Sequence, residues 1–294
     1  MNSNYFPTEH VRIPVDKSTV LQNGIVKPED EDLIVPYIDI RIKGSALYKN
    51  RLLMLDIVAN NEWKRPIYFT GGAFSDDDYI WMKDYLQLDG MCYKLVPIYS
   101  PVYRANPFDM GRVDAEFWYE KVKKWKWGNS DSDATYHDPE TRKNAITYRA
   151  NMARLVEQFI NEGEPEKAEE SADLAIEKMP VKYFGYYTLL EPFISAYYEV
   201  GSDEKARDLY KEVSVKYQEN LKYYSELDVD KQYDLAEDII TDIERYKSLV
   251  GIVALYDKSI SNEEMDAFRY HLKLFKHFYE NDADDINLVP DDAD

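Results

Sequence analysis

The sequence has 294 residues, 45% of them hydrophobic, and a formal net charge of −20 at pH 7. This length suits one large domain or two ordinary ones. The negative charge repels phosphate backbones and so disfavours nucleic-acid binding, and no apolar run reaches the roughly 18 residues of a membrane helix. Residues 1–16 also lack the basic start and the apolar core of a signal peptide, so we expect this chain to be soluble.

The first elements read as strands and a helix. Val11–Val15 is a short β-prone run in which Pro14 marks an edge strand. Ile38–Ile42 alternates apolar and charged residues, as a half-exposed strand does. Lys49–Asn61 is predicted to be a helix with a wide buried stripe formed by Leu52, Leu53, Leu55, Ile57, Val58 and Ala59.

Two further β-rich runs follow, RPIYFTGG and MCYKLVPI, and then a helix predicted from Met110 to Trp127. Trp118, Val122 and Trp125 recur at helical spacing, which favours packing into the core over contact with a membrane surface. The lone Cys92 lies in the second run and is read as a core residue, since a single cysteine excludes an internal disulfide. This order of elements predicts a small α/β layer.

From Glu140 onward the chain is predicted to be almost entirely helical. The charge is concentrated there, because residues 1–138 carry 17 Lys and Arg against 21 Asp and Glu, whereas residues 139–294 carry 19 against 35. The predicted helices cover residues 140–162, 165–178, 189–200, 203–225, 230–257 and 262–280.

Within this half, Met152–Pro180 reads as a helical hairpin of tetratricopeptide type, and a second copy follows it. Four pairs of positions stand 38 residues apart: Gly163 and Gly201, Ala168 and Ala206, Ala172 and Tyr210, Ala175 and Val213. The third helix pair lacks these landmarks, as expected of a capping repeat.

The predicted fold class is therefore α+β. A small α/β domain over residues 1–135 precedes a tetratricopeptide-like domain over residues 136–285, and residues 286–294 form an acidic tail expected to be disordered.

Four segments carry a resemblance to a known family: NRLLMLDIVANNEWKRPIYFTGG, DYLQLDGMCYKLVPI, KWGNSDSDATYHDPETRKNAITYRANMARLV and EGEPEKAEESADLAIEKMP. They resemble the carboxyl-terminal soluble half of a family of large bacterial membrane proteins of unknown function. The amino-terminal half of that family is similar to protein O-mannosyltransferases and is missing from this sequence. The resemblance implies an accessory region without a transferase active site, on the periplasmic side of the cytoplasmic membrane.

The polar loop Asn129–Glu140 is a candidate calcium site. Asn129, Asp131, Asp133 and Glu140 occupy positions 1, 3, 5 and 12 of a calcium-binding loop. However, Ala134 replaces the turn-forming glycine of such loops, and Asp138 before Pro139 is well placed to cap a helix. We therefore predict a linker, and we expect neither a metal nor a cofactor.

A binding surface is predicted where the first helices of successive hairpins line a concave groove. Its residues are Glu157, Asn161, Glu191, Ser195, Tyr198 and Glu199. Carboxylates and a tyrosine suit a basic peptide, or a sugar that stacks on Tyr198. The alternative reading is that these side chains merely face solvent or pack on the first domain.

The sequence shows no catalytic motif. We predict a non-catalytic accessory or scaffold region of an envelope glycosyltransferase-like system that binds a protein or glycan partner. The alternative is a carbohydrate-active enzyme with Asp56, Asp78 and Asp84 as candidate participants, which would require two carboxyl groups about 5–10 Å apart.

Overall fold

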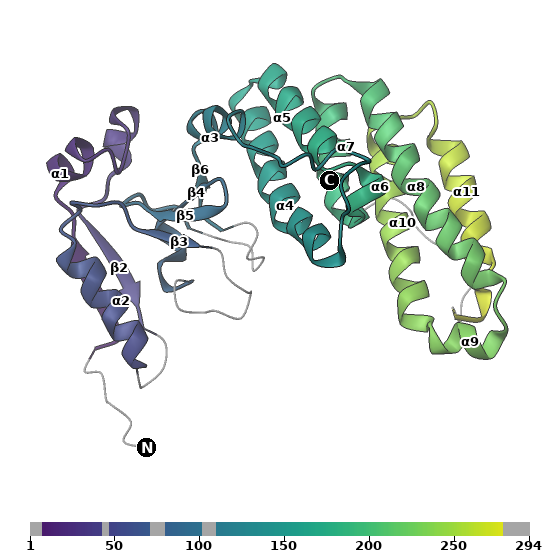
Figure 1. Cartoon of the computed structure of the whole chain (residues 1–294), viewed down its shortest axis with the longest axis horizontal. Helices are drawn as coiled ribbons and strands as arrows, with labels where there is room; N and C mark the ends of the chain where they lie inside the picture. Colours follow the sequence, from purple (N-terminus) through teal and green to yellow (C-terminus); the bar gives the residue numbers. More distant parts are fainter. Residues whose placement is uncertain (1–7, 43–46, 71–79, 102–109, 279–294) are drawn as a thin grey trace. The chain divides into compact units, whose positions relative to one another are not determined.

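The structure is a computed structural model that describes residues 8–42, 47–70, 80–101 and 110–278. The chain divides into two compact units, residues 1–126 and residues 127–294. All strands in the described ranges belong to the first unit, and the second unit is built from helices (Figure 1). The predicted α+β fold class is therefore confirmed. Within those ranges, no helix combines the length and apolarity needed to cross a bilayer.

A two-stranded antiparallel ribbon opens the first unit. It consists of β1 (His10–Pro14) and β2 (Tyr37–Arg41), as predicted, and α1 (Lys17–Gln22) and the 3-10 helix η1 (Pro28–Leu33) connect them. Because side chains alternate along a strand, the ribbon has a buried apolar face and an exposed polar face. The apolar face carries Ile13, Ile38 and Ile40.

Helix α2 (Lys49–Asn60) packs against β1, and Figure 1 shows it lying alongside the ribbon. The predicted helix is confirmed, but its wide buried stripe is wrong. Leu55 and Val58 are buried, whereas Leu52, Leu53 and Ile57 are 49%, 53% and 62% exposed, and Ala59 is exposed as well. Residues 55 and 58 lie on one side of a helix, so a single packing partner covers only that side.

A four-stranded sheet follows in the order β3-β5-β4-β6, with β4 and β6 parallel and the other pairs antiparallel. The 3-10 helix η2 (Ile80–Tyr85) precedes β4. The two predicted strands are confirmed as β3 and β5. The sequence pattern missed β4 and β6, which are defined by their pairing with neighbouring strands. The four strands are β3 (Tyr68–Thr70), β4 (Leu86–Asp89), β5 (Cys92–Leu95) and β6 (Arg112–Val113).

Helix α3 (Ala115–Val122) is shorter at both ends than the predicted helix from Met110 to Trp127. Gly111 has a φ of +80° and precedes β6, and the side chain of Asp114 caps α3 by accepting from the Phe117 amide. Trp118 and Val122 are fully buried, as their spacing predicted, whereas Trp125 lies beyond the end of α3 and is half-buried.

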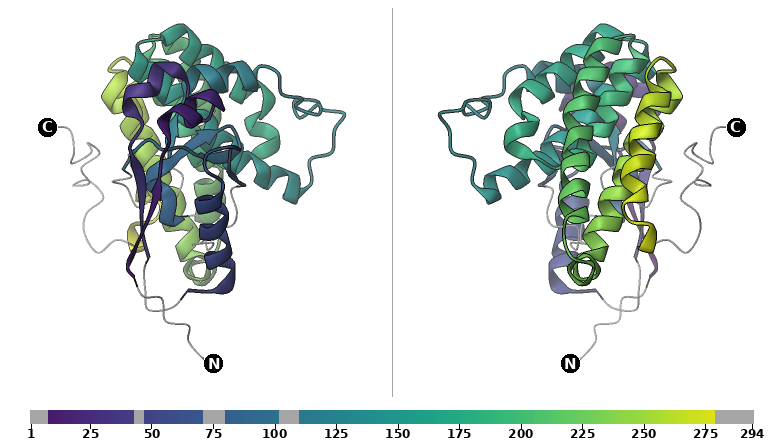
Figure 2. Two further views of the ribbon diagram at one scale, coloured as in Figure 1. Left: turned by 90° about the vertical axis from the view of Figure 1, so that its left-hand side faces the viewer. Right: turned by 90° about the vertical axis from the view of Figure 1, so that its right-hand side faces the viewer.

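The second unit consists of three helix pairs. Each of α4, α7 and α10 packs against the helix that follows it, which is α5, α8 and α11 respectively. α7 also packs on α4 and α5, and α10 packs on α7 and α8, so the pairs are stacked in sequence order (Figures 1 and 2). The helices are α4 (Pro139–Glu162), α5 (Pro165–Lys178), α6 (Val181–Phe184), α7 (Glu191–Glu199), α8 (Asp203–Ser225), α9 (Val229–Asp234), α10 (Ala236–Tyr256) and α11 (Ser261–Lys273), with 3-10 turns η4 (Tyr187–Leu190) and η5 (Lys276–Phe278).

The landmark positions of the first two pairs behave alike. Gly163 and Gly201 stand at the turns after α4 and α7 with φ values of +74° and +81°. Their six partner positions are all buried: Ala168, Ala172, Ala175, Ala206, Tyr210 and Val213.

The third pair departs from the prediction. The prediction of a single helix over residues 230–257 is wrong, because the helix is interrupted at Leu235. This residue is the C-cap of α9 and the N-cap of α10. The buried Gln232 amide donates to the carbonyl of Leu227 at 2.8 Å, and this contact holds α9 against the end of the preceding loop. No glycine or proline marks this break in the sequence. The predicted last helix over residues 262–280 stops at Lys273, and the acidic tail over residues 286–294 lies outside the described residues.

Candidate functional site

The six predicted groove residues lie on the first helices of two stacked pairs. Glu157 and Asn161 are exposed on α4, and Glu199 is exposed at the end of α7. Glu191 and Ser195 are half-buried, and Tyr198 is only 8% exposed. The residues therefore do not form one open surface.

Two of the predicted groove residues on α7 accept hydrogen bonds from the third helix pair. Ser248 on α10 donates to Glu191 at 2.8 Å, and Tyr256 donates its hydroxyl proton to Glu199 at 2.7 Å. Burial raises the pKa of the Glu191 carboxyl above its ordinary value. These contacts join α7 to α10 and leave Glu157, Asn161 and part of Glu199 to solvent.

Tyr198 is unavailable as a platform for a sugar, contrary to the expectation from the sequence. Its ring stacks on Tyr256 with centroids 5.6 Å apart and planes within 5°, and its hydroxyl donates to Asp257 at 3.3 Å. Asp257 also accepts from the Arg207 guanidinium at 2.6 Å. The aromatic side chain predicted for the groove is thus part of the packing between hairpins.

The carboxylates of the candidate calcium loop, Asn129–Glu140, form ion pairs with lysines. Asp131 binds Lys178 at 2.8 Å, Asp133 binds Lys182 at 2.8 Å, and Glu140 binds Lys143. Within the described ranges, no group of three or more His, Cys, Asp or Glu side chains could hold a metal ion.

The predicted cap at the end of that loop is confirmed. Asp138 accepts from the amides of Glu140 and Thr141, and Pro139 opens α4. The loop also docks on the helical unit, because the Ser130 hydroxyl donates to the Lys178 carbonyl at 2.6 Å. The domain boundary predicted at residue 135 falls within this loop and stays a prediction.

The structure describes two of the three carboxylates named for the enzyme alternative, Asp56 and Asp84. Asp56 is exposed on α2 and accepts from the Asn60 amide of the same helix. Asp84 is half-buried in η2, where its backbone carbonyl accepts from Ser100. Asp78 lies outside the described residues, so the enzyme reading stays a prediction.

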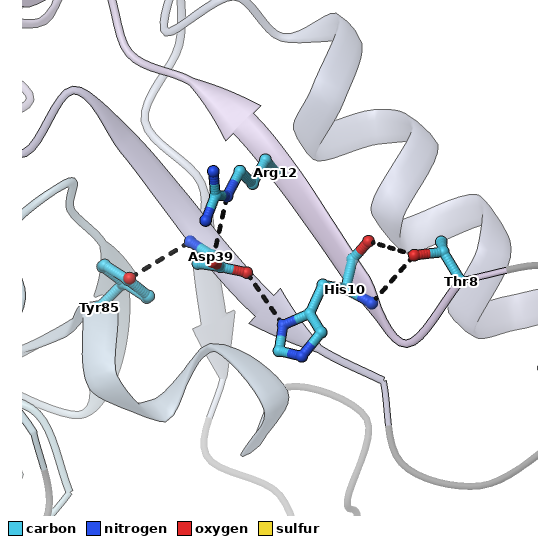
Figure 3. Close-up of polar contacts among 5 residues, drawn as sticks. All are labelled: Thr8, His10, Arg12, Asp39 and Tyr85. Atoms are coloured by element: carbon cyan, nitrogen blue, oxygen red, sulfur yellow. Dashed lines mark hydrogen bonds and ion pairs between the residues drawn. The ribbon is translucent and has the colours of Figure 1, made fainter.

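A polar cluster that the sequence reading missed lies on the exposed face of the β1–β2 ribbon (Figure 3). Asp39 on β2 bridges two side chains of β1: its Oδ1 is 3.3 Å from His10 Nδ1, and its Oδ2 accepts from Arg12 Nε at 3.2 Å. The Asp39 amide donates to the Tyr85 hydroxyl at 3.2 Å. The register places Arg12 opposite Asp39, and alternation within the two strands is the signal that could have revealed the cluster.

The cluster can bind and orient charged groups. The Arg12 guanidinium carbon lies 4.4 Å from the centre of the Tyr37 ring, a cation–π contact. The backbone amide and carbonyl of His10 both bond to the Thr8 hydroxyl. The Thr8 hydroxyl is therefore engaged with the His10 backbone.

A second polar cluster is buried beneath the four-stranded sheet. Lys94 on β5 is 8% exposed and donates to the Gly24 carbonyl at 3.3 Å, and the buried Asp114 binds Lys27 at 3.1 Å. Burial lowers the pKa of Lys94 and raises that of Asp89. Perturbed pairs of this kind are frequent at functional sites and also in structural networks.

The edge of this buried cluster reaches the surface at Tyr68. Its hydroxyl donates to Asp89 at 3.3 Å, and burial followed by the neighbouring carboxylate raises the pKa of Tyr68 to about 12. Gln87 donates to the same Asp89 at 2.8 Å. Asp89, the last residue of β4, therefore accepts hydrogen bonds from two side chains, as a structural carboxylate does.

Comparison with known proteins concerns mainly the first unit. No curated protein and no solved structure matches the chain. The family model of TMEM260-associated domain 2 matches residues 1–117, which include the ribbon, the four-stranded sheet and the start of α3.

Proposed function

We propose that this chain is a non-catalytic accessory region of a TMEM260-like membrane protein, where it holds a partner without transforming it. The observation that carries the proposal is the match of residues 1–117 to TMEM260-associated domain 2. A helical unit of stacked pairs follows the matched segment, and stacked helical hairpins are a recurrent protein-binding architecture.

The helical unit is proposed to be tetratricopeptide-like. The left-handed glycines at two equivalent turns and the buried small residues at equivalent positions support this assignment. The resemblance noted in the sequence suggests that the membrane-embedded partner half is O-mannosyltransferase-like, and that this region resides on the periplasmic side of the membrane.

The proposed partner is a protein segment that contacts the first-helix face of the helical unit. Glu157 and Asn161 are exposed there, and Glu199 is exposed on the neighbouring helix. The burial of Tyr198 removes the aromatic platform on which a glycan would have stacked, which favours a protein over a glycan at this face.

Site-specific photocrosslinking in envelope preparations tests the proposal. A photoreactive phenylalanine at Asn161 is expected to give a discrete protein adduct that Glu157→Lys abolishes. The same residue at Glu166, which is exposed on α5, is the matched control and should give no such adduct. Equal adducts from both positions would contradict the assigned face, and turnover of a glycan by the purified chain would contradict the non-catalytic role.

A further inference from the structure

The polar face of the β1–β2 ribbon carries more positive than negative side chains in a strongly acidic chain. His10 and Arg12 on β1 and Arg41 on β2 share this face with a single carboxylate, Asp39. The His10 and Arg12 side chains are 56% and 62% exposed. Among the residues that the structure describes, Arg41 makes no ion pair.

Arg12 is held in a fixed orientation that leaves much of its hydrogen-bonding capacity unused. Its Nε donates to Asp39, and its guanidinium plane lies over Tyr37. Within the described ranges, its two terminal nitrogens have no hydrogen-bond partner. A guanidinium that is restrained by a carboxylate and an aromatic ring presents a preorganised fork for a second carboxylate.

We propose that this face docks an acidic peptide segment of a partner protein in extended conformation. Residues 10 and 12 project from the same side of β1, about 7 Å apart along the strand, and Arg41 lies opposite His10 in the register. Arg41 is thus the diagonal neighbour of Arg12, about 7–8 Å away across the two strands. Alternate side chains of an extended peptide have a similar spacing, so two of its carboxylates can meet Arg12 and Arg41 together.

An extended peptide fits this face better than a membrane surface does. The cations stand on an exposed ribbon, and a short segment would contact the ribbon alone. An anionic bilayer would contact a wider area than a short peptide does, and residues 1–138 hold no excess of positive charge to attract it, with 17 Lys and Arg against 21 Asp and Glu. The proposal concerns a different surface from the first-helix face and stands independently of it.

Fluorescence anisotropy of the full chain with a labelled octaglutamate peptide tests this docking face. Arg12→Gln and Arg41→Gln are each expected to weaken binding roughly five- to tenfold, and added salt should weaken binding to the unaltered chain. Lys64→Gln is the matched control, because it removes the same charge from an exposed lysine of the same unit that pairs with Glu62. Circular dichroism of each variant verifies that the fold is retained.

Three outcomes would overturn the proposal. The first is that the peptide fails to bind at low ionic strength. The second is that Lys64→Gln weakens binding as much as the arginine variants do. The third is that phosphatidylglycerol vesicles bind through Arg12 and Arg41 while the peptide does not. The last result would assign the face to a lipid surface.

Discussion

At the scale of single residues, two carboxylates of this chain are held in opposite ways. Asp257 accepts from Arg207 and from the Ser259 hydroxyl and amide, and the guanidinium holds the pKa of that carboxyl well below its usual range. Asp89 has no cation within ion-pair distance among the described residues, and burial raises its pKa. The charged form is therefore stabilised at one position and penalised at the other.

Asp257→Asn is expected to lower the melting temperature at pH 7. A carboxyl whose pKa is depressed in the folded state contributes stability above its unfolded pKa, and that contribution is lost as the pH falls towards the folded value. The difference between the variant and the parent should therefore shrink below about pH 4. Thermal melts at pH 7 and at acid pH measure it, and a pH-independent difference would show that charge is not the cause.

Asp89→Asn is expected to change stability in the opposite direction and raise the melting temperature at pH 7. The raised pKa means that the ionised carboxylate costs stability at neutral pH, and this cost disappears as the pH falls through the raised pKa. The two proteins should become equal below about pH 4, where the carboxyl is protonated in both states. The same pair of melts serves as the measurement, and a variant less stable than the parent at pH 7 would contradict the account.

At the scale of elements, one fully buried cation on α4 links the ends of α5 and α6. Arg149 on α4 is 0% exposed and donates to the carbonyls of Met179 and Gly185. These carbonyls belong to the C-caps of α5 and α6, where helix dipoles place partial negative charge. The two helix ends thus supply the counter-charge that a buried guanidinium needs, although burial still lowers the pKa of Arg149 to about 10.

Replacing Arg149 tests this arrangement. Arg149→Met is expected to cost about 2–4 kcal/mol of unfolding free energy, because two buried carbonyls lose a charged donor. Urea denaturation measures the cost, and amide exchange should accelerate between residues 179 and 190. Lys143→Met, which removes an exposed ion pair of the same helix, should change stability by less than about 1 kcal/mol. Similar losses in both variants would refute the specific role of Arg149.

The turn between α4 and α5 also depends on a single residue. Gly163 has a φ of +74°, and no atom lies within 4 Å of where a Cβ would stand. Gly163→Ala therefore meets no clash and reports backbone strain alone, which should cost about 1 kcal/mol in denaturant unfolding. Glu162→Ala, at an exposed helical position beside it, should be close to neutral. A neutral Gly163→Ala would show that the turn can rearrange.

At the scale of the whole molecule, polar contacts of tyrosines join successive helix pairs in the second unit. Tyr197 donates to Asp173 on the preceding pair, Tyr210 donates to Glu264 on the following one, and the Tyr246 hydroxyl accepts from Gln218. Burial raises the pKa of each of these tyrosines, so they remain protonated at physiological pH. The second unit therefore has an extensive core of its own.

Residues 127–278 produced alone are expected to fold. Their helices pack against one another and bury the large side chains Phe159, Phe193 and Tyr246 completely, and a unit with its own core can fold alone. Far-ultraviolet circular dichroism should show a helical spectrum, and thermal unfolding should be cooperative. Loss of helicity on removing residues 1–126 would mean that the second unit depends on the first.

Much of the element order could be predicted from the sequence, since it is encoded locally. The bounds of α4, α5 and α8 follow from capping residues, from prolines at helix starts and from glycines at turns. The interruption at Leu235 could not be predicted in this way, because no glycine, proline or side-chain cap marks it in the sequence. The strands β4 and β6 were missed because their pairing with neighbouring strands defines them, and this pairing is not visible in a short stretch of sequence.

The sequence by itself determined the fold class, the two compositionally distinct halves and the equivalent positions of the first two helix pairs, because these depend on residue spacing along the chain. Only the tertiary structure decided that Tyr198 is buried against Tyr256, that Leu52 and Ile57 are exposed, and that Asp39 unites His10 with Arg12. Whether a side chain is accessible depends on what other elements place over it, and helical or strand periodicity carries no information about those elements.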